Sequence, residues 1–514
     1  MVSFVSAQYT MGVLVLAYEY DEAVMGVGVE VLCLSMGCLT FSAWFSARIL
    51  SKSGGCVGAG SRFLAQMSRR FQVRGAARPQ AFPDSRFLVL AAGINAVAGV
   101  FFWVIASRFF STTAVGQAST VVSVGTSVAS LSLLSIGPVI ERYFPVLSVQ
   151  RRVRAALLSC VGVVLSAVLC SGVYVWVWDS SVVFPTLVSK CAFCCCVVVL
   201  ALFALSDSVL NGWGVPRVMG WKNVSQGVLK AVVVGAVAAL GLSSVVWAGW
   251  LLVWCWVGVS VLVLLAVVGV LVARVRIDAA TNSSHVSAIS HDSVLSPADD
   301  GIPVRSQAIR FHRTSIVWLL GQSIPGLFIP SMVVSQAGLE QAAFFNTAWL
   351  IVNASLMIMA IFTGPFVSKA VAPGAVVSAL WPQMKVTTLR VSALRFVGVS
   401  VIGPLALYVY GAEYAQAAGW LLVLMGIAHV VGAPAFLFGV LSKVYSRIVF
   451  PACVQVCASV VLVLAVWWLL PHFGIVAVGV AYLIQDVGIL LVAWIPLRRL
   501  VALSHAQSSS SVEV

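Results

Sequence analysis

The chain has 514 residues, of which 61% are hydrophobic and only 9% are charged, and its mean hydropathy is +1.05. Soluble globular proteins carry about 25% charged residues, so most of this chain is not built to face water. The composition predicts an integral membrane protein and excludes soluble enzymes and free nucleic-acid-binding proteins.

The net charge is +14, from 30 Lys and Arg against 16 Asp and Glu. In a soluble protein such an excess indicates a polyanionic partner, whereas in a membrane protein basic residues accumulate in cytoplasmic loops. The positions of the basic residues along the chain distinguish between these two explanations.

A transmembrane helix needs about 20 mostly apolar residues. Windows of that length predict six spans, a polar stretch and six further spans, which makes the fold class all-α and polytopic. The first group is 87–107, 115–140, 155–178, 182–210, 224–242 and 245–273. The second group is 315–336, 341–365, 391–411, 414–441, 446–470 and 474–497.

The basic residues alternate between the two ends of these spans. All but three of the 30 fall in connections on one side, among them Lys222, Lys385 and Arg395. On the other side lie only Arg108 and Lys190, and a single basic residue, Lys230, lies inside a span. By the positive-inside rule, both ends of the twelve-helix body are cytoplasmic. This distribution accounts for the net charge without a nucleic-acid partner.

Polar segments divide the chain into five predicted parts. These are an N-terminal extension with a basic cytoplasmic segment (1–86), a six-helix lobe (87–273), a polar cytoplasmic linker (274–313), a second six-helix lobe (314–500) and a cytoplasmic tail (501–514). Within the extension, residues 23–47 are apolar but contain Glu30. They form either an extra N-terminal hydrophobic helix that crosses the membrane or an extension that does not.

The two lobes show a weak internal repeat. A shift of 227 residues places Gly99 on Gly326 and Gly137–Pro138 on Gly364–Pro365. With six spans per lobe, such repeats have the same orientation in the membrane, as parallel repeats of transporters do.

No catalytic motif is present, which predicts that the chain is not an enzyme. HExxH, P-loop, paired CxxC and Ser-His-Asp patterns are all missing from the sequence. The 12 Cys mostly lie in apolar runs, where Cys packs as a small hydrophobe, so we expect no metal site. The missing P-loop also argues against a self-contained ATP-driven pump.

Ionisable side chains at membrane depth are costly and are therefore functional candidates. The Lys230 ammonium either extends towards the cytoplasm or faces a water-filled cavity. Asp207 either pairs with Lys230 or Arg217 or caps a helix end. Asp486, in the middle of the last span, either couples transport to a cation or proton or is a structural carboxylate, protonated or paired with Arg.

Other polar side chains have equally open roles. Arg108 either receives an anionic headgroup or anchors its helix at the interface. His429 either packs against its neighbours or relays protons. The amides of Asn95, Gln322 and Asn346 lie within spans, where they either bond between helices or line a path for sugars.

Several stretches resemble a known family of membrane proteins. The runs are NAVAGVFFWVIASRFFSTTAVGQASTVVSVGTSVASLSLLSIGPVIERYFP (95–145), LFALSDSVLNGWGVPRVMGWKNVSQGVLK (202–230), AAFFNTAWLI (342–351), YGAEYAQAAGWLLVLMGIA (410–428) and GIVAVGVAYLIQDVGIL (474–490). They are similar to helices of bacterial polysaccharide-repeat-unit flippases, which belong to the multidrug/oligosaccharidyl-lipid/polysaccharide exporter superfamily. Two departures are Trp213, which stands where the family usually has Arg, and the extension 1–86.

The resemblance implies two six-helix lobes around a central cavity that rock between inward- and outward-open states. The cargo would be an isoprenoid-diphosphate-linked oligosaccharide, flipped from the cytoplasmic to the outer leaflet of a bacterial cytoplasmic membrane for cell-surface polysaccharide biosynthesis. Lys230, Arg108, Asn95, Gln322 and Asn346 would line the substrate cavity. Asp207 and Asp486 would couple transport to a proton or sodium gradient, with no other cofactor.

The implied partners are the lipid-linked oligosaccharide, membrane lipid, and glycan polymerase or ligase machinery, and the chain is expected to be a monomer. Two alternatives stay open. One is a cation-coupled multidrug antiporter of the same superfamily, and the other is a non-transporting scaffold for envelope assembly.

Overall fold

The computed structural model describes residues 81–144, 147–178, 182–245, 247–286, 301–370, 377–445, 447 and 449–510. The expectations for residues 23–47, for nearly all of the extension and for the middle of the linker concern residues outside this set. The predicted part boundaries therefore stay predictions.

The first half of the described chain contains α4 to α10. These elements are α4 (Ala81–Phe109), α5 (Thr112–Ser132), α6 (Ile136–Tyr143), α7 (Val149–Val177), α8 (Leu187–Gly212), α9 (Pro216–Ala239), η4 (Leu242–Ser244) and α10 (Ala248–Val286). The second half contains α11 (Gly301–Ala370), α12 (Val377–Phe396), η5 (Val397–Ile402), α13 (Gly403–Tyr410), α14 (Ala412–Val431), α15 (Ala433–Val444), α16 (Val449–Phe473) and α17 (Val476–Ser510).

Every predicted span overlaps at least one helix, and the described residues contain no strand, which confirms the all-α class. Helices satisfy every main-chain polar group within one segment, as lipid requires. The predicted spans 315–336 and 341–365 both belong to α11, which is interrupted at Gly338. There the φ angle of 87° lies in the left-handed region that glycine adopts without strain.

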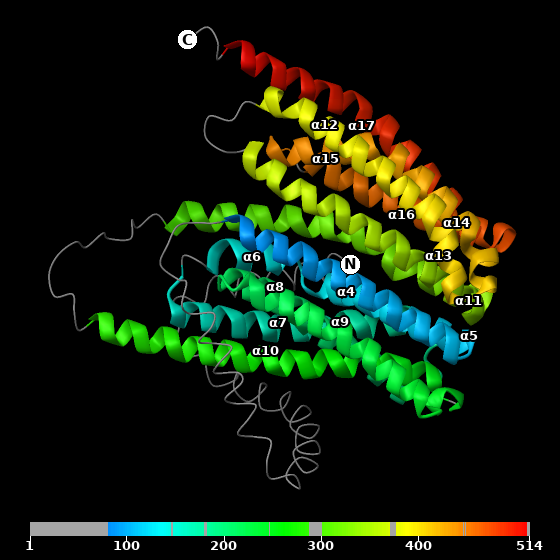
Figure 1. Cartoon of the computed structure of the whole chain (residues 1–514). Helices are drawn as coiled ribbons and strands as arrows, with labels where there is room; N and C mark the ends of the chain where they lie inside the picture. Colours follow the sequence, from blue (N-terminus) through cyan, green and yellow to red (C-terminus); the bar gives the residue numbers. More distant parts are fainter. Residues whose placement is uncertain are drawn as a thin grey trace. The chain divides into compact units, whose positions relative to one another are not determined.

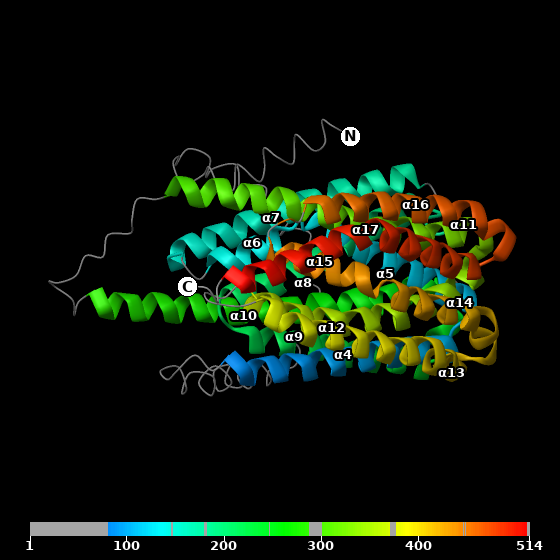
Figure 2. The same cartoon turned by 90° about the horizontal axis from the view of Figure 1, so that it is seen from above.

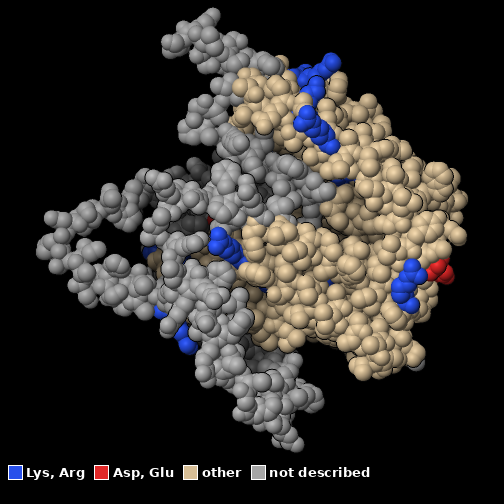
Figure 3. All heavy atoms as spheres, viewed as in Figure 1, with Lys and Arg blue, Asp and Glu red and all other residues tan. Residues whose placement is uncertain are grey.

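Nine helices of the described chain are long and apolar enough to cross a membrane, and one of them, Ile316–Leu356, combines two predicted spans. The helices α5 and α9 are not among the nine, because Ser, Thr, Gln and Lys interrupt their apolar residues. On the face shown in Figure 3, most of the described surface carries neither acidic nor basic side chains. The chain is a multi-pass membrane protein.

Contacts divide the described residues into two compact units. The smaller contains residues 81–86, 147–162 and 265–286, and within it the Nε atom of Arg152 donates to the Leu147 carbonyl (2.8 Å) where α7 begins. The larger contains the remaining described residues, and every site discussed below lies in it.

In the larger unit, α5 of the first half packs against α11 of the second, as Figures 1 and 2 both show. The same α11 also packs against α16, and α17 packs against α14, α15 and α16. Phe102, Phe193, Phe345 and Tyr414 are among the largest fully buried side chains. Aromatic side chains therefore contribute to the core in both halves.

Candidate functional site

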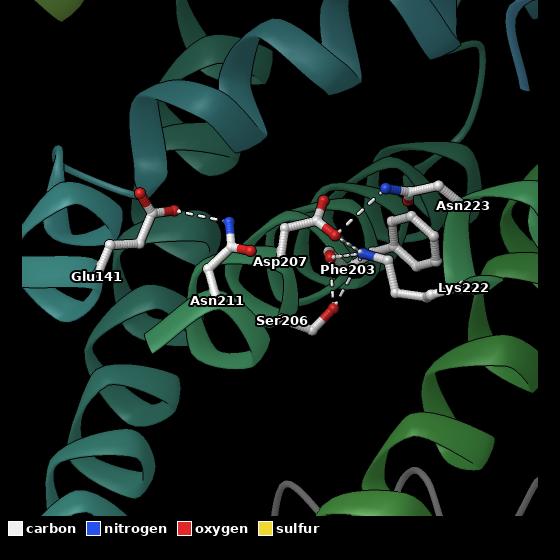
Figure 4. Close-up of polar contacts among 7 residues, drawn as sticks. All are labelled: Glu141, Phe203, Ser206, Asp207, Asn211, Lys222 and Asn223. Carbon is white, nitrogen blue, oxygen red and sulfur yellow. Dashed lines mark hydrogen bonds and ion pairs between the residues drawn. The ribbon is translucent and has the colours of Figure 1, made fainter. Parts of the chain in front are cut away.

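An ion pair joins α8 to α9 (Figure 4). The Nζ atom of Lys222 lies 2.7 Å from Oδ1 of Asp207, and the Lys222 side chain is fully buried while that of Asp207 is 32% exposed. Lys222 also donates to the Phe203 carbonyl (2.7 Å) and to the Ser206 hydroxyl (3.1 Å), and it lies 3.7 Å from the centre of the Phe203 ring. Asn223 adds a weaker bond to Asp207 (3.4 Å).

A tight turn between the two helices brings these groups together. Gly214 has a φ angle of 73°, and Pro216 occupies the first turn of α9, where its missing N–H leaves no bond unmade. Glu141 of α6 accepts a bond from Asn211 next to the turn (3.4 Å). The carboxylate of Asp207 on α8 is thus held by two residues of α9, Lys222 and Asn223.

The pairing partner of Asp207 was not predicted. Sequence analysis offered Lys230, Arg217 or a helix cap, and it placed Lys222 in a cytoplasmic connection. The structure begins α9 at Pro216, eight residues before the predicted span, so Lys222 is helical and buried. The sequence feature that could have indicated this pairing is the short turn from Gly214 to Pro216. It places Asp207 and Lys222 at similar distances from the tip of the α8–α9 hairpin.

Lys230 lies two turns further along α9 and has a different environment. Its side chain is only 3% exposed, and its ammonium lies 3.5 Å from the centre of the Trp256 ring of α10. No described carboxylate pairs with it. A cation over a desolvated indole gains about 2 kcal/mol, which is less than the cost of burying an unpaired charge. Among the described residues, Lys230 therefore has an aromatic ring and no carboxylate beside its amine.

Asn95 is the one other predicted cavity residue near Lys230. It lies on α4 one turn before Gly99, the residue whose absent side chain leaves room beside the Lys230 ammonium (3.9 Å). The Oδ1 atom of Asn95 is buried and accepts no hydrogen bond within the described part of the protein. One turn before Lys230, Gln226 of α9 donates to Ser260 of α10 (3.1 Å). The Asn95 oxygen lies beside Gly227, one turn before Lys230 on α9.

Asn346 lies elsewhere, between the two halves. Its amide donates to the hydroxyls of Ser119 (3.1 Å) and Thr120 (3.0 Å) on α5. Ser119 and Asn346 are 227 residues apart, the same offset at which the sequence weakly repeats. Next to them, Gly116 of α5 lies against the Leu339 carbonyl of α11. The halves therefore meet along a pair of helices in corresponding positions.

Arg108 and Gln322 lie apart from Lys230 as well. The Arg108 side chain is exposed and binds main-chain carbonyls at the end of α13, as described below, and the Gln322 side chain is also exposed. Of the five predicted cavity residues, the structure places only Lys230 and Asn95 together.

Asp486 lies in α17 of the second half, where it interacts electrostatically with Arg395 of α12. Arg395 also lies near His429 of α14 and is only 5% exposed. Sequence analysis counted Arg395 with the basic residues of a cytoplasmic connection, although the predicted span 391–411 contains it, and in the structure Arg395 is helical and buried. No basic residue lies close to Asp486 in the sequence, as expected, and Arg395 belongs to another helix. No group of three His, Cys, Asp or Glu residues in the described part could hold a metal ion.

No protein-family model and no curated protein sequence matches this chain. Solved structures do match it. One, described as the inward-facing conformation of a multidrug resistance MATE family transporter of the MOP superfamily, aligns with a TM-score of 0.57 at 11% identity, over 82% of this chain and 99% of that one. A MOP superfamily transporter from Pyrococcus furiosus, described as having a binding pocket of reverse polarity, aligns with a TM-score of 0.53 at 12% identity, over 82% and 95%.

At these identities the likeness shows the fold alone. The chain has the all-α fold of these transporters, with 12 helices in two lobes. The MOP superfamily is also the one to which the sequence resemblance pointed.

Proposed function

We propose that the chain is a membrane transporter that works by alternating access. Two halves that meet along α5 and α11, with Asn346 bonded across the contact, provide a junction about which they rock. The solved transporter with the same fold and a TM-score of 0.57 is inward-facing, and the contact of Arg108 with α13 closes the end that the sequence predicts to be outer.

The first candidate cargo is an isoprenoid-diphosphate-linked oligosaccharide, and the observation that carries this proposal is the buried Lys230, which has no carboxylate partner among the described residues. A diphosphate and its sugars do not cross hydrocarbon unaided, whereas the isoprenoid tail remains in the bilayer. A buried cation with no carboxylate partner offsets the desolvation of an oxyanion through charge-assisted hydrogen bonds. The direction would be from the cytoplasmic to the outer leaflet of a bacterial cytoplasmic membrane.

The second candidate is a cation-coupled multidrug antiporter, and the comparisons favour it over the first, since a solved protein with this fold is a multidrug resistance transporter. A cationic drug needs an uncompensated carboxylate in its path. Asp207 is partly exposed but paired with Lys222, and Asp486 lies near Arg395. The charges of the described residues therefore favour an anionic cargo, while the comparisons favour a drug.

One experiment separates the candidates. Bacteria depleted of the chain are complemented with wild type, Lys230→Gln or the exposed control Lys385→Gln, and intact cells are probed with a membrane-impermeant glycan label. Flipping is supported if lipid-linked glycan accumulates in depleted cells and in Lys230→Gln cells but not in the others. In those two cases the glycan should become labelled only after the cells are permeabilised. If label is unchanged and efflux of the lipophilic cation ethidium is lost on depletion, the chain is a drug antiporter. If both are unchanged, the transport proposal fails.

A further inference from the structure

A small cavity lies between the two halves, at the end that the sequence predicts to be outer. Its walls come from α5, from the end of α7 and the connection after it, and from α11 of the second half. Most of the side chains in the walls are apolar, but Thr120, Tyr174 and Ser331 carry hydroxyl groups. The space open to the centre of a water molecule is about 10 Å³. By this measure a volume of about 10–15 Å³ holds one water molecule, so the cavity has the size for water and not for an organic ligand.

The hydroxyl group of Thr120 has a hydrogen that is not used in the bond it makes. Its oxygen accepts a bond from the Asn346 amide of α11 (3.0 Å), and the Thr120 side chain is only 2% exposed. Among the described residues, the Thr120 hydroxyl donates to no acceptor. A buried hydroxyl hydrogen without an acceptor is unfavourable, so an acceptor inside the cavity would stabilise this end of the protein.

The other two hydroxyl groups are bonded to each other across the halves. Tyr174 of α7 forms a hydrogen bond with Ser331 of α11, and Ser331 also donates to the Leu327 carbonyl of its own helix (3.5 Å). Because Ser331 uses its hydrogen there, its oxygen accepts from Tyr174. A phenol oxygen that donates its one hydrogen keeps lone pairs that can accept. Tyr174 therefore has an acceptor to offer to the cavity, and Thr120 has a donor.

Packed aromatic rings form much of the remaining wall. Trp178, directly after α7, packs against Phe328 of α11 with the ring centres 6.5 Å apart. Phe184 packs against Phe193 of α8 with the ring centres 5.0 Å apart, and both side chains are buried. A molecule in the cavity would thus lie among well-packed side chains rather than under a loose loop.

We propose that this cavity binds one water molecule, which accepts a hydrogen bond from Thr120 and donates one to Tyr174. Cavities that stay dry are apolar, whereas a cavity that offers two to four polar partners takes up water. The water completes a network that runs from Asn346 through Thr120 and Tyr174 to Ser331. Such a bridge is nearly as favourable as a direct hydrogen bond.

The network begins and ends on α11 of the second half and passes through α5 and α7 of the first. The water therefore links two bonds that each cross from one half to the other. Its role in closure rests on the proposed function, in which the halves separate at this end in the outward-open state. The cavity then loses its wall on α11, so the water-binding site exists only while the outer end is closed.

The test is X-ray footprinting of the full chain in nanodiscs. A pulse splits water into hydroxyl radicals, which oxidise the side chains beside them, and mass spectrometry locates the oxidation. Phe184 reports on the cavity, and Phe193, which is buried behind it and does not line the cavity, is the internal control. Mixing with ¹⁸O-labelled water just before the pulse separates bound from bulk water, for which the exposed Trp176 is the reference.

Two variants assign the ligand. Thr120→Val removes the hydroxyl with little change in shape, and Ser119→Ala is the matched control, because Ser119 also accepts from Asn346 but does not line the cavity. In wild type we expect Phe184 to be oxidised at least about three-fold faster than Phe193, with slower uptake of ¹⁸O than at Trp176. The rate at Phe184 should fall to that of Phe193 in Thr120→Val and stay unchanged in Ser119→Ala.

Oxidation of Phe184 that is no faster than that of Phe193 in wild type would show that the cavity is dry and would overturn the proposal. Uptake of ¹⁸O at Phe184 as fast as at Trp176 would overturn it as well, because the oxidising water would then be bulk solvent. An equal fall in both variants would assign the signal to the Asn346 contact instead of to Thr120. If Thr120→Val does not fold, the wild-type comparison still decides whether the cavity holds water. Since neither cargo nor transport is measured, failure here is separate from failure of the glycan-labelling experiment.

Discussion

The guanidinium of Arg108 binds the last turn of α13 in the opposite half, with Nε donating to the Val409 carbonyl at 3.0 Å. Its Nη2 atom donates to the Tyr408 carbonyl (3.1 Å), and the neighbouring Ser107 donates to the Tyr410 carbonyl (3.3 Å). A cation is favourable at a helix C-terminus, where the carbonyls lack intrahelical partners. Arg108 therefore links α4 to α13 at the end that the sequence predicts to be outer.

Replacing Arg108 with Ala should weaken this closure. The contact is exposed, so the loss is about 1 kcal/mol, which shifts the ratio of open to closed states about five-fold. In nanodiscs, hydrogen–deuterium exchange should rise in the peptides that end α4 and α13, and Lys385→Ala should leave it unchanged. Equal exchange in wild type and Arg108→Ala would show that this contact does not hold the end closed.

Replacing Lys222 with Met should destabilise the protein, because it leaves the Asp207 carboxylate without its cation. Removal of one partner of a buried pair costs about 3 kcal/mol, and the partial exposure of Asp207 places this case at the low end of the range. Thermal unfolding in detergent measures the effect. The double variant Lys222→Met/Asp207→Leu should recover most of the lost stability, and a double variant as unstable as the single one would argue against the ion pair as the cause.

Replacing Lys230 with Met should not destabilise the protein, in contrast to Lys222→Met. Since no described carboxylate depends on its charge, the unfolding temperature should stay the same or rise, while transport of an anionic cargo should fall at least ten-fold. Stability and transport are measured on the same preparation. A fall in unfolding temperature like that of Lys222→Met would assign Lys230 a structural role.

Replacing Gly116 with Ala should separate α5 from α11, since the added methyl group would overlap the Leu339 carbonyl oxygen. Forced overpacking of this kind costs about 1–3 kcal/mol. Gly93→Ala on α4 is the matched control, because no atom lies within 4 Å of its added methyl group, and it should be neutral or stabilising by about 0.5–1 kcal/mol. Equal unfolding temperatures for the two variants would show that the close approach at Gly116 is not required.

Hydropathy and charge placement were enough to predict the helices, because lipid imposes both on the sequence directly. The same method left Lys222 outside the predicted span 224–242, and it counted Arg395 with a connection although the predicted span 391–411 contains it. In the structure Lys222 forms an ion pair with Asp207 of another helix, and Arg395 interacts electrostatically with Asp486 of another helix. Pairings of this kind depend on which helices are neighbours, and a single sequence does not contain that information.

The contacts of Lys230 and Arg108 could not be predicted from the sequence for the same reason. Its depth followed from its position six residues into a predicted span, but the Trp256 ring that receives it lies on the next helix. Likewise, Arg108 was correctly placed at the end of its span, while its bond to α13 depends on how the two halves meet.

The polarity of α9 has a consequence for how the protein is made. A lysine at the centre of a helix disfavours insertion by about 2.5–3.5 kcal/mol, and α9 carries both Lys222 and Lys230. Its neighbour α8 is among the nine apolar helices and supplies the carboxylate that neutralises Lys222. We therefore expect α9 to enter the bilayer more favourably together with α8, as a hairpin in which Asp207 pairs with Lys222, and the two helices follow each other directly along the chain.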